Sequence, residues 1–211
     1  MSQKRYFRIY KPYGMLSQFT REGNHPTLAD LGSLPPDIYP IGRLDADSEG
    51  LLLLTNNPVV NGLLLNPAEA HERTYWVQVD GDISAEAIAK LQQPMVIKLK
   101  TGLYTTLPCK AHKMETPDLP PRIPSIRFRK DIPTSWVEIK LIEGKNRQVR
   151  KMTAAVGFPT LRLVRVCMEV LKLGMMQPGE VKEVTEEKFF ASLRIEKTRG
   201  NQKKRPSQLN L

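Results

Sequence analysis

Alternating apolar and polar residues recur along the chain in short stretches, and this pattern predicts a series of β-strands. The clearest stretch covers residues 72–80, where Tyr75, Val77 and Val79 fall on one face. Similar patterns occur at residues 6–10, 95–99, 107–114, 136–143, 160–166, 170–173 and 181–184. So many short strands in succession predict an α+β protein that is rich in antiparallel connections.

Short helices are expected between some of these strands, because capping residues precede apolar stripes. Asn56 or Asn57, followed by Pro58, would start one helix. The apolar stripe of that helix would consist of Val59, Leu63 and Leu64. Further helical segments are predicted at residues 27–31, 84–92, 146–156 and 186–193. Five prolines between residues 115 and 134 exclude a regular element there.

A charged loop at residues 42–50, GRLDADSEG, lies between two apolar runs. The run that follows consists of four consecutive leucines at residues 51–54 and predicts a buried strand or a buried helix segment. The acidic residues of the loop imitate the start of a calcium-binding loop; they are Asp45, Asp47 and Glu49. The twelfth position of such a loop would be Asn56, where calcium requires a bidentate Glu, so we exclude calcium.

The chain of 211 residues has a net charge of +10 and a pI of about 9.7, which favours a polyanionic partner such as RNA. Cations concentrate at residues 145–151, near the start of a predicted helix, and helical spacing puts Arg147, Arg150 and Lys151 on one face. Cations at a helix N-terminus oppose the helix dipole, and an anionic partner would offset that cost. A solvated basic face is the alternative interpretation.

Other features narrow the class of protein. The two cysteines, Cys109 and Cys167, imply no disulfide framework and fit a reducing compartment. The N-terminal residues lack the apolar core of a signal peptide, and no apolar stretch is long enough to span a membrane, so we expect a cytoplasmic protein. The three histidines lack the spacing of metal ligands and no nucleotide-binding motif is present, so we expect no cofactor and no metal.

Four blocks of sequence follow one another as they do in a known family of enzymes. They are KPYG at 11–14, GRLD at 42–45, RTY at 73–75 and EGKNRQVRKM at 143–152. In this order they resemble the bacterial RsuA-type RNA pseudouridine synthases. The short N-terminus and the wording DADSEGLLLLTN resemble the E branch of the large-subunit ribosomal RNA enzymes, without the S4 RNA-binding module of many relatives. The family often has Lys where Arg73 stands, so the charge is kept.

The resemblance implies the pseudouridine synthase fold, which is a mixed, mostly antiparallel sheet in two subdomains with an RNA-binding cleft between them. The catalytic domain would cover residues 5–195, and a basic tail at 196–211 would be disordered. The implied activity is the isomerisation of a specific uridine in ribosomal RNA, most closely that of the large subunit, to pseudouridine. This reaction needs neither a cofactor nor a metal.

The resemblance also implies roles for individual residues. Asp45 would be the catalytic residue, with attack at C6, attack at C1′ and proton removal from C2′ all open. Arg150 would be the adjacent cation that keeps Asp45 ionised. Tyr75 would stack on the target base, although an ordinary core aromatic is the alternative. The residues expected to bind RNA or the flipped base are Lys11, Arg43, Lys145, Asn146, Arg147, Lys151 and Leu163.

Two other functions compete with this interpretation. One is a non-catalytic RNA-binding protein that retains the fold, although Asp45, Tyr75 and Arg150 are all present. The other is a hydrolase that uses Asp45 and Asp47 as paired acids, as a glycosidase does. The cationic helix argues against a neutral sugar as substrate.

Overall fold

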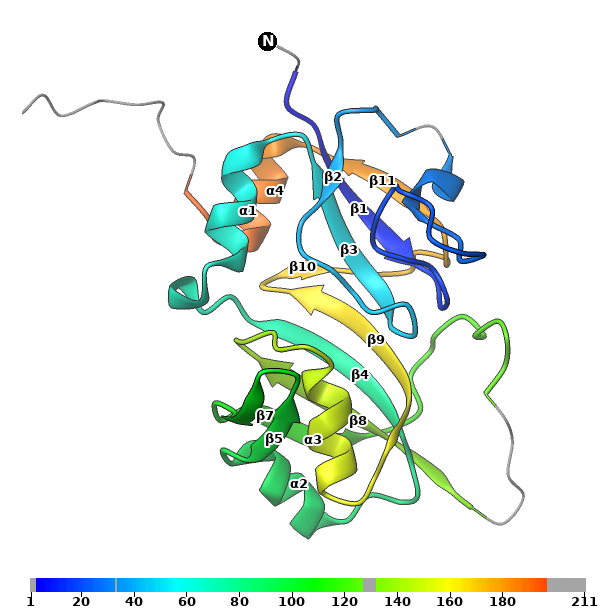
Figure 1. The fold of residues 1–211 in the computed structure, drawn as a ribbon, viewed down its shortest axis with the longest axis vertical. Coiled ribbons are helices and arrows are strands. Elements are labelled where there is room, and N and C mark those ends of the chain that lie inside the picture. Colours follow the sequence, from blue (N-terminus) through cyan, green and yellow to red (C-terminus); the bar gives the residue numbers. More distant parts are fainter. Residues whose placement is uncertain (1–2, 33, 127–131, 197–211) are drawn as a thin grey trace, which may run out of the picture.

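The computed structural model describes residues 3–32, 34–126 and 132–196, which form two lobes joined by one continuous sheet (Figure 1). Within these residues the sheet has nine strands, and its main path runs β11-β1-β3-β9-β4-β8-β7. The strands of the upper lobe are β1 (Tyr6–Lys11), β2 (Tyr39–Pro40), β3 (Glu49–Thr55) and β11 (Val181–Val184). The remaining strands of the sheet are β4 (Arg73–Asp80), β7 (Lys110–Met114), β8 (Thr134–Leu141), β9 (Thr160–Met168) and β10 (Leu171–Lys172).

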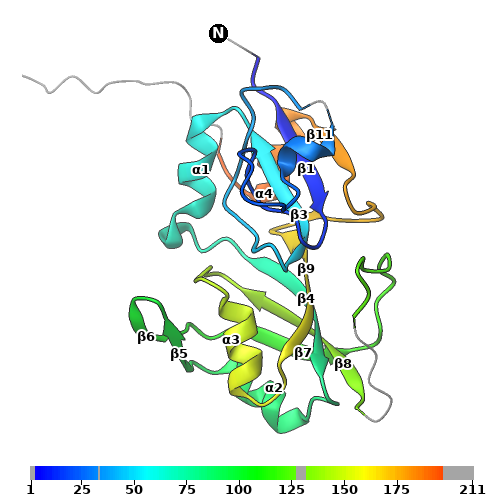
Figure 2. The ribbon, with the colours of Figure 1, turned by 45° about the vertical axis from the view of Figure 1, so that its right-hand side comes forward.

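The two lobes meet where β3 lies beside β9. This pairing is parallel and consists of only two residue pairs, Glu49 with Val164 and Gly50 with Arg165. The other strand pairs of the sheet are antiparallel, which confirms the predicted α+β class with mostly antiparallel connections. Because β3 starts at this junction, the charged loop before it lies between the lobes (Figure 2).

Strand β3 is buried on both faces, and this explains its four leucines. Leu51 and Leu53 enter a core that the helices α1 (Pro58–Leu65) and α4 (Glu186–Leu193) cover. Leu52 and Leu54 enter a second core, on the other face, beneath the segment that follows β1. A strand with two buried faces needs apolar residues at every position rather than at every second one.

The predicted helices are present, with changes at their ends and faces. Helix α1 starts after the capping residue Asn57, as expected, but it buries Val60 and Leu64 while Val59 is 46% exposed. The predicted stripe was therefore wrong at Val59, because α1 turns the side that carries Val60 and Leu64 toward the core. Thr27 caps a short 3-10 helix, Leu28–Leu31, and a second one covers Pro67–Glu69.

The lower lobe has its own core on the face of β4 that carries Tyr75, Val77 and Val79. Helices α2 (Ala85–Gln92) and α3 (Gln148–Ala155) pack on this face. Helix α3 starts one residue later than predicted. Its N-terminal flanking residue is Arg147 rather than Asn146, and the left-handed φ of 53° at Arg147 keeps this residue out of the helix. The predicted strand at 107–114 begins only at Lys110. The predicted strand at 95–99 is β5 (Val96–Leu99), and its hairpin partner β6 (Gly102–Thr105) was not predicted.

The described parts of the proline-rich stretch, residues 115–126 and 132–133, contain no helix or strand, as predicted. The expectations for residues 127–131 and for the tail after residue 196 lie outside the described residues. None of the helices in the described part of the chain is long and apolar enough to cross a membrane.

Candidate active site

A cavity of about 680 Å³ lies between the two lobes, at the junction of β3 and β9. The upper lobe contributes the charged loop, and the lower lobe contributes β4, β9 and the segment before α3. The cavity brings together most of the predicted site residues: Arg43, Asp45, Tyr75, Lys145, Asn146, Arg147 and Leu163. Three predicted residues, Lys11, Arg150 and Lys151, do not line this cavity.

The loop that carries Asp45 is held in place by hydrogen bonds to its backbone. Ser17 Oγ donates to Leu44 O at 2.8 Å, and Leu44 N donates back to Ser17 Oγ at 3.0 Å. Ser48 N donates to Asp45 O at 3.0 Å and closes the turn. Gly50 then permits the close approach to β9, because a Cβ there would lie 2.3 Å from the carbonyl oxygen of Arg165. Asp45 is thus held at the cavity wall, with 36% of its side chain exposed.

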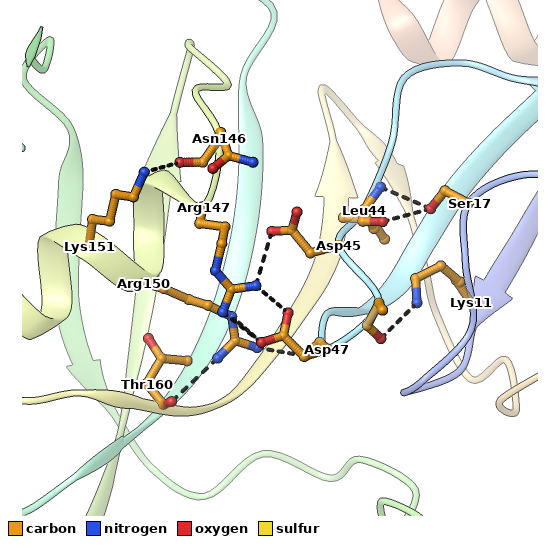
Figure 3. A network of polar contacts seen from close by, with 11 residues as sticks. Lys11, Ser17, Leu44, Asp45, Asp47, Asn146, Arg147, Arg150, Lys151 and Thr160 are labelled. Carbon is orange, nitrogen blue, oxygen red and sulfur yellow. Dashed lines mark hydrogen bonds and ion pairs between the residues drawn. The ribbon is translucent and has the colours of Figure 1, made fainter. Parts of the chain in front are cut away.

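Lys11 supports this loop from the inside of the protein and is fully buried. Its Nζ donates to the carbonyl oxygens of Pro12, Met15 and Ala46, at 2.8, 2.7 and 3.4 Å. Burial lowers the pKa of Lys11 to about 8, although nearby carboxylates oppose this effect. The prediction that Lys11 contacts RNA is therefore wrong, because the side chain is buried and its Nζ is hydrogen-bonded within the protein (Figure 3).

The pKa of Lys11 predicts a measurable pH dependence of stability. Between about pH 8 and 10.5 the unfolded chain holds a proton on Lys11 that the folded chain has lost, so this residue makes the free energy of unfolding rise with pH. In Lys11→Met that contribution should vanish. Urea unfolding at several pH values gives the free energy of unfolding of the wild type and of Lys11→Met. Subtracting one from the other at each pH leaves the contribution of Lys11, because tyrosines and cysteines titrate in both proteins. A difference that does not change with pH would contradict this assignment.

Asp47 is contacted by two arginines, Arg150 of α3 and Arg147 just before this helix (Figure 3). Arg147 forms a bidentate pair with Asp47, with N–O distances of 2.8 and 2.7 Å, and lies 3.9 Å from Asp45. Arg150 Nε lies 3.4 Å from Asp47 Oδ2, and its Nη groups donate to the carbonyl oxygens of Asp47 and Thr160. The structure therefore corrects the expected pairing of Arg150 with Asp45: Arg147 contacts Asp45, and Arg150 holds Asp47.

Opposing effects determine the charges in this cluster. Burial raises the pKa of Asp47, but the hydrogen bonds from Arg147 and the charges of Arg150 and Arg147 outweigh it, so the pKa lies below its usual value of 3.8. Burial lowers the pKa of Arg150. The pKa of Arg147 is raised, mainly by its hydrogen bonds to Asp47. At neutral pH the cluster is a carboxylate clamped by guanidinium groups, and it joins the upper lobe to α3.

We expect Asp47→Asn to retain the fold but to lose the clamp. Single-turnover activity should fall about tenfold, because Arg147 and Arg150 are no longer fixed, and stability at pH 7 should fall by about 1 kcal/mol. Since the folded pKa of Asp47 is depressed, this contribution is present above pH 3.8 and is lost as the pH falls below it. Asp82→Asn, which removes an exposed carboxylate paired with Lys113, is the matched control. Equal effects of the two changes would contradict a special role for Asp47.

Part of the cavity wall is formed by an aromatic and an apolar residue of the lower lobe. Tyr75 and Leu163 are 8% and 6% exposed, belong to the lower core and also line the cavity. The hydroxyl of Tyr75 has no hydrogen-bond partner among the residues that the structure describes. Such a wall could take the face of a planar base.

The other predicted RNA contacts lie at or near the rim of the cavity. Arg43 is exposed and donates to Gln18 Oε1 at 3.2 Å. Lys145 Nζ lies 4.7 Å from the ring centre of Tyr104. Lys151 Nζ donates to Asn146 O at 2.9 Å, so it supports the segment before α3 rather than facing the cavity.

Two buried carboxylates, Glu143 and Glu49, position the site through partners that were not predicted from the sequence. Glu143 accepts hydrogen bonds from Tyr104 Oη at 2.6 Å, from Leu107 N at 2.8 Å and from Gln148 Nε2. Glu49, at the start of β3, pairs with Arg162 of β9 at 2.7 and 3.0 Å. Apart from Gln148, their partners are 36 or more residues away in the sequence, so local spacing could not have revealed them.

In the described part of the chain, no group of three or more His, Cys, Asp or Glu residues is placed to hold a metal ion. The loop carboxylates Asp47 and Glu49 instead face arginines. The site that the structure defines is a cleft lined by two acidic residues, Asp45 and Glu143, by Tyr75 and by several cationic residues.

Comparisons with known proteins show the family of the chain. The sequence profile of the RNA pseudouridylate synthase family matches residues 5–155. The chain belongs to this family, and it is an RNA pseudouridine synthase, as predicted.

Its relatives include several ribosomal RNA enzymes. A ribosomal large subunit pseudouridine synthase E of Vibrio parahaemolyticus is 48% identical, over 82% of this chain and 71% of the relative. The enzyme of the same name from Xanthomonas campestris is 47% identical, over 82% of this chain and 91% of the relative. A ribosomal large subunit pseudouridine synthase B of Bacillus subtilis is 34% identical, over 85% of this chain and 68% of the relative. The predicted similarity to the E branch is confirmed.

Solved structures share the fold. The crystal structure of a pseudouridylate synthase superposes with a TM-score of 0.72, at 22% identity, and covers 91% of this chain and 75% of the other. Human RNA pseudouridylate synthase domain containing 1 superposes with a TM-score of 0.53, at 16% identity, over 92% and 84%. The predicted pseudouridine synthase fold is confirmed.

Proposed function

We propose that this enzyme converts a uridine of large-subunit ribosomal RNA to pseudouridine, with Asp45 as the catalytic carboxylate. The observation that carries the proposal is that Asp45 lines the same cavity as Tyr75 and Leu163. The large-subunit substrate is taken from relatives that carry that description and are 44–48% identical.

The reaction breaks the N1–C1′ bond, turns the base and forms a C5–C1′ bond. The hydrogen on C5 leaves as a proton and N1 gains one, so no redox partner is needed. The target base must leave its stack to enter a cavity of this kind. Tyr75 would stack on it, and Leu163 would pack against it. Asp45 would attack C6, attack C1′ or remove a proton from C2′.

The cationic residues would hold the RNA and keep the site in place. Arg147 lies 3.9 Å from Asp45, so its guanidinium group is placed beside the catalytic carboxylate. Arg150 fixes Asp47 and therefore acts through the clamp. Arg43 at the rim would meet a phosphate or fill the vacated stack. We place the enzyme in the cytoplasm, since its two cysteines are free thiols and ribosomal RNA is its proposed substrate.

One alternative loses support and the other stays testable. Asp47 is bound by two arginines, so a hydrolase with Asp45 and Asp47 as paired acids has no free second acid. A non-catalytic RNA-binding protein would bind the same RNA without changing it.

Release of tritium from RNA that carries [5-³H]uridine measures the reaction, because C5 loses its hydrogen. We expect the purified protein to release tritium from large-subunit ribosomal RNA at one position, and not from small-subunit RNA used as the control. Binding without release would favour the non-catalytic alternative. Release from small-subunit RNA alone would contradict the proposed substrate.

A further inference from the structure

Arg165, on β9, is a buried arginine at the cavity that the mechanism above does not use. It is 4% exposed and lines the same cavity as Asp45. Its Nε donates to Leu51 O at 2.8 Å, whereas neither Nη nitrogen has an acceptor among the described residues, and Nη2 is sealed from solvent. Arg165 also forms no ion pair with any residue that the structure describes. A buried cation without partners is unfavourable unless a ligand supplies the acceptor.

The backbone holds Arg165 at this place from both sides. On β4 the partner of Thr74 is Cys167 and the partner of Tyr75 is Arg165, so Val166 is an extra residue and β9 has a bulge there. Bulges redirect side chains and are frequent beside active sites. On the other side, Gly50 pairs with Arg165 so closely that any side chain at residue 50 would clash with it. Arg165 therefore lies beside both Tyr75 and the strand that follows the catalytic loop.

Arg73 shows what a structural arginine looks like at the same cavity. Its Nη1 and Nη2 donate to the carbonyl oxygens of His71 and Leu64, both at 3.0 Å, so its donors are used within the protein. In Arg165 only Nε is hydrogen-bonded within the described residues, to Leu51 O, whereas the two Nη groups are free to donate. A small movement of the guanidinium toward the cavity would therefore break no other hydrogen bond.

We propose that Arg165 donates a hydrogen bond to a carbonyl oxygen of the target uracil and thereby selects uridine; this inference rests on the proposed function. Uracil is nearly symmetrical about the line from N3 to C6, so O2 and O4 exchange places when N1 and C5 do. A fixed donor thus meets a carbonyl oxygen before and after the base turns. Cytosine would present an amino group at one of these positions, and two donors would then face each other.

The test measures single-turnover rates at saturating enzyme, together with RNA affinity at several salt concentrations, on a large-subunit ribosomal RNA transcript. We expect Arg165→Met and Arg165→Lys to slow the reaction about 10- to 100-fold with little change in the salt dependence of binding. Arg43→Met, which removes a rim cation at the same cavity, is the comparison. It should weaken binding and flatten the salt dependence by about one unit of slope.

A second measurement starts from the wild type, so its first result does not depend on how the variants fold. Transcripts that contain 2-thiouridine or 4-thiouridine replace O2 or O4 by a weaker acceptor. At least one of them should slow the wild type about tenfold and leave Arg165→Met unchanged. If neither slows the wild type, or if Arg165→Met changes only the salt dependence as Arg43→Met does, Arg165 does not bind the base. If the wild type releases no tritium from the unmodified transcript, the proposed function itself fails, and this inference fails with it.

Discussion

Asp45→Asn is expected to fold like the wild type and to form pseudouridine at least about 1,000-fold more slowly. Asparagine has nearly the same shape, and the only ion pair that the structure records for the Asp45 side chain is the 3.9 Å contact with Arg147. The amide can neither act as a nucleophile nor accept a proton. Single-turnover tritium release measures the rate, and thermal unfolding checks the fold.

The matched control for this change is again Asp82→Asn, because it removes a carboxylate that is exposed and remote from the cavity. That variant should react at the wild-type rate. RNA affinity of Asp45→Asn should stay within a few-fold of the wild type, since the lost group is an anion and binds no phosphate. Turnover of Asp45→Asn close to that of the wild type would contradict the proposed mechanism.

Tyr75→Leu is expected to retain RNA binding and to lose about 100-fold in rate, because the stacking surface for the base is removed. Leucine keeps an apolar side chain in the lower core, to which Tyr75 belongs. Tyr75→Phe keeps the ring, so its rate should stay within about tenfold of the wild type. Single-turnover rates and urea unfolding of both variants separate activity from stability.

The outcomes for Tyr75 distinguish a base contact from a core residue. If Tyr75→Leu loses stability and activity in parallel, the ring serves mainly the core. If Tyr75→Phe loses as much activity as Tyr75→Leu without a loss of stability, the hydroxyl rather than the ring matters. That result would agree with the absence of a hydrogen-bond partner for the hydroxyl among the described residues.

The parts of the fold that the sequence predicts best are those set by local periodicity and capping. The alternation in residues 72–80 corresponds to β4, and Glu186–Leu193 is helical as expected. The prediction failed where tertiary contacts decide. Val59 and Val60 are equally apolar, and only the orientation of α1 on the sheet determines that Val60 is buried.

The candidate site could be predicted in part for the same reason. The motifs identify Asp45, Tyr75 and the basic segment, and the structure places all three at or beside one cavity. The sequence does not say which arginine meets which carboxylate. Helical spacing predicts Arg147 and Arg150 on one face, whereas Arg147 lies just before α3 with a left-handed φ of 53°. The sequence also gives no sign that Lys11 faces the interior. Lys11 and Gly14 of the KPYG turn both donate hydrogen bonds to Ala46 O in the loop at 42–50, and these contacts between distant residues bury Lys11.

Mapping of pseudouridines in ribosomal RNA tests the central claim most directly. RNA from cells without this gene is compared with RNA from the same cells carrying either the wild-type gene or the Asp45→Asn gene. We predict that one position in the large-subunit RNA loses pseudouridine on deletion and that only the wild-type gene restores it. An unchanged set of pseudouridines in the large-subunit RNA, or restoration by Asp45→Asn, would contradict the account.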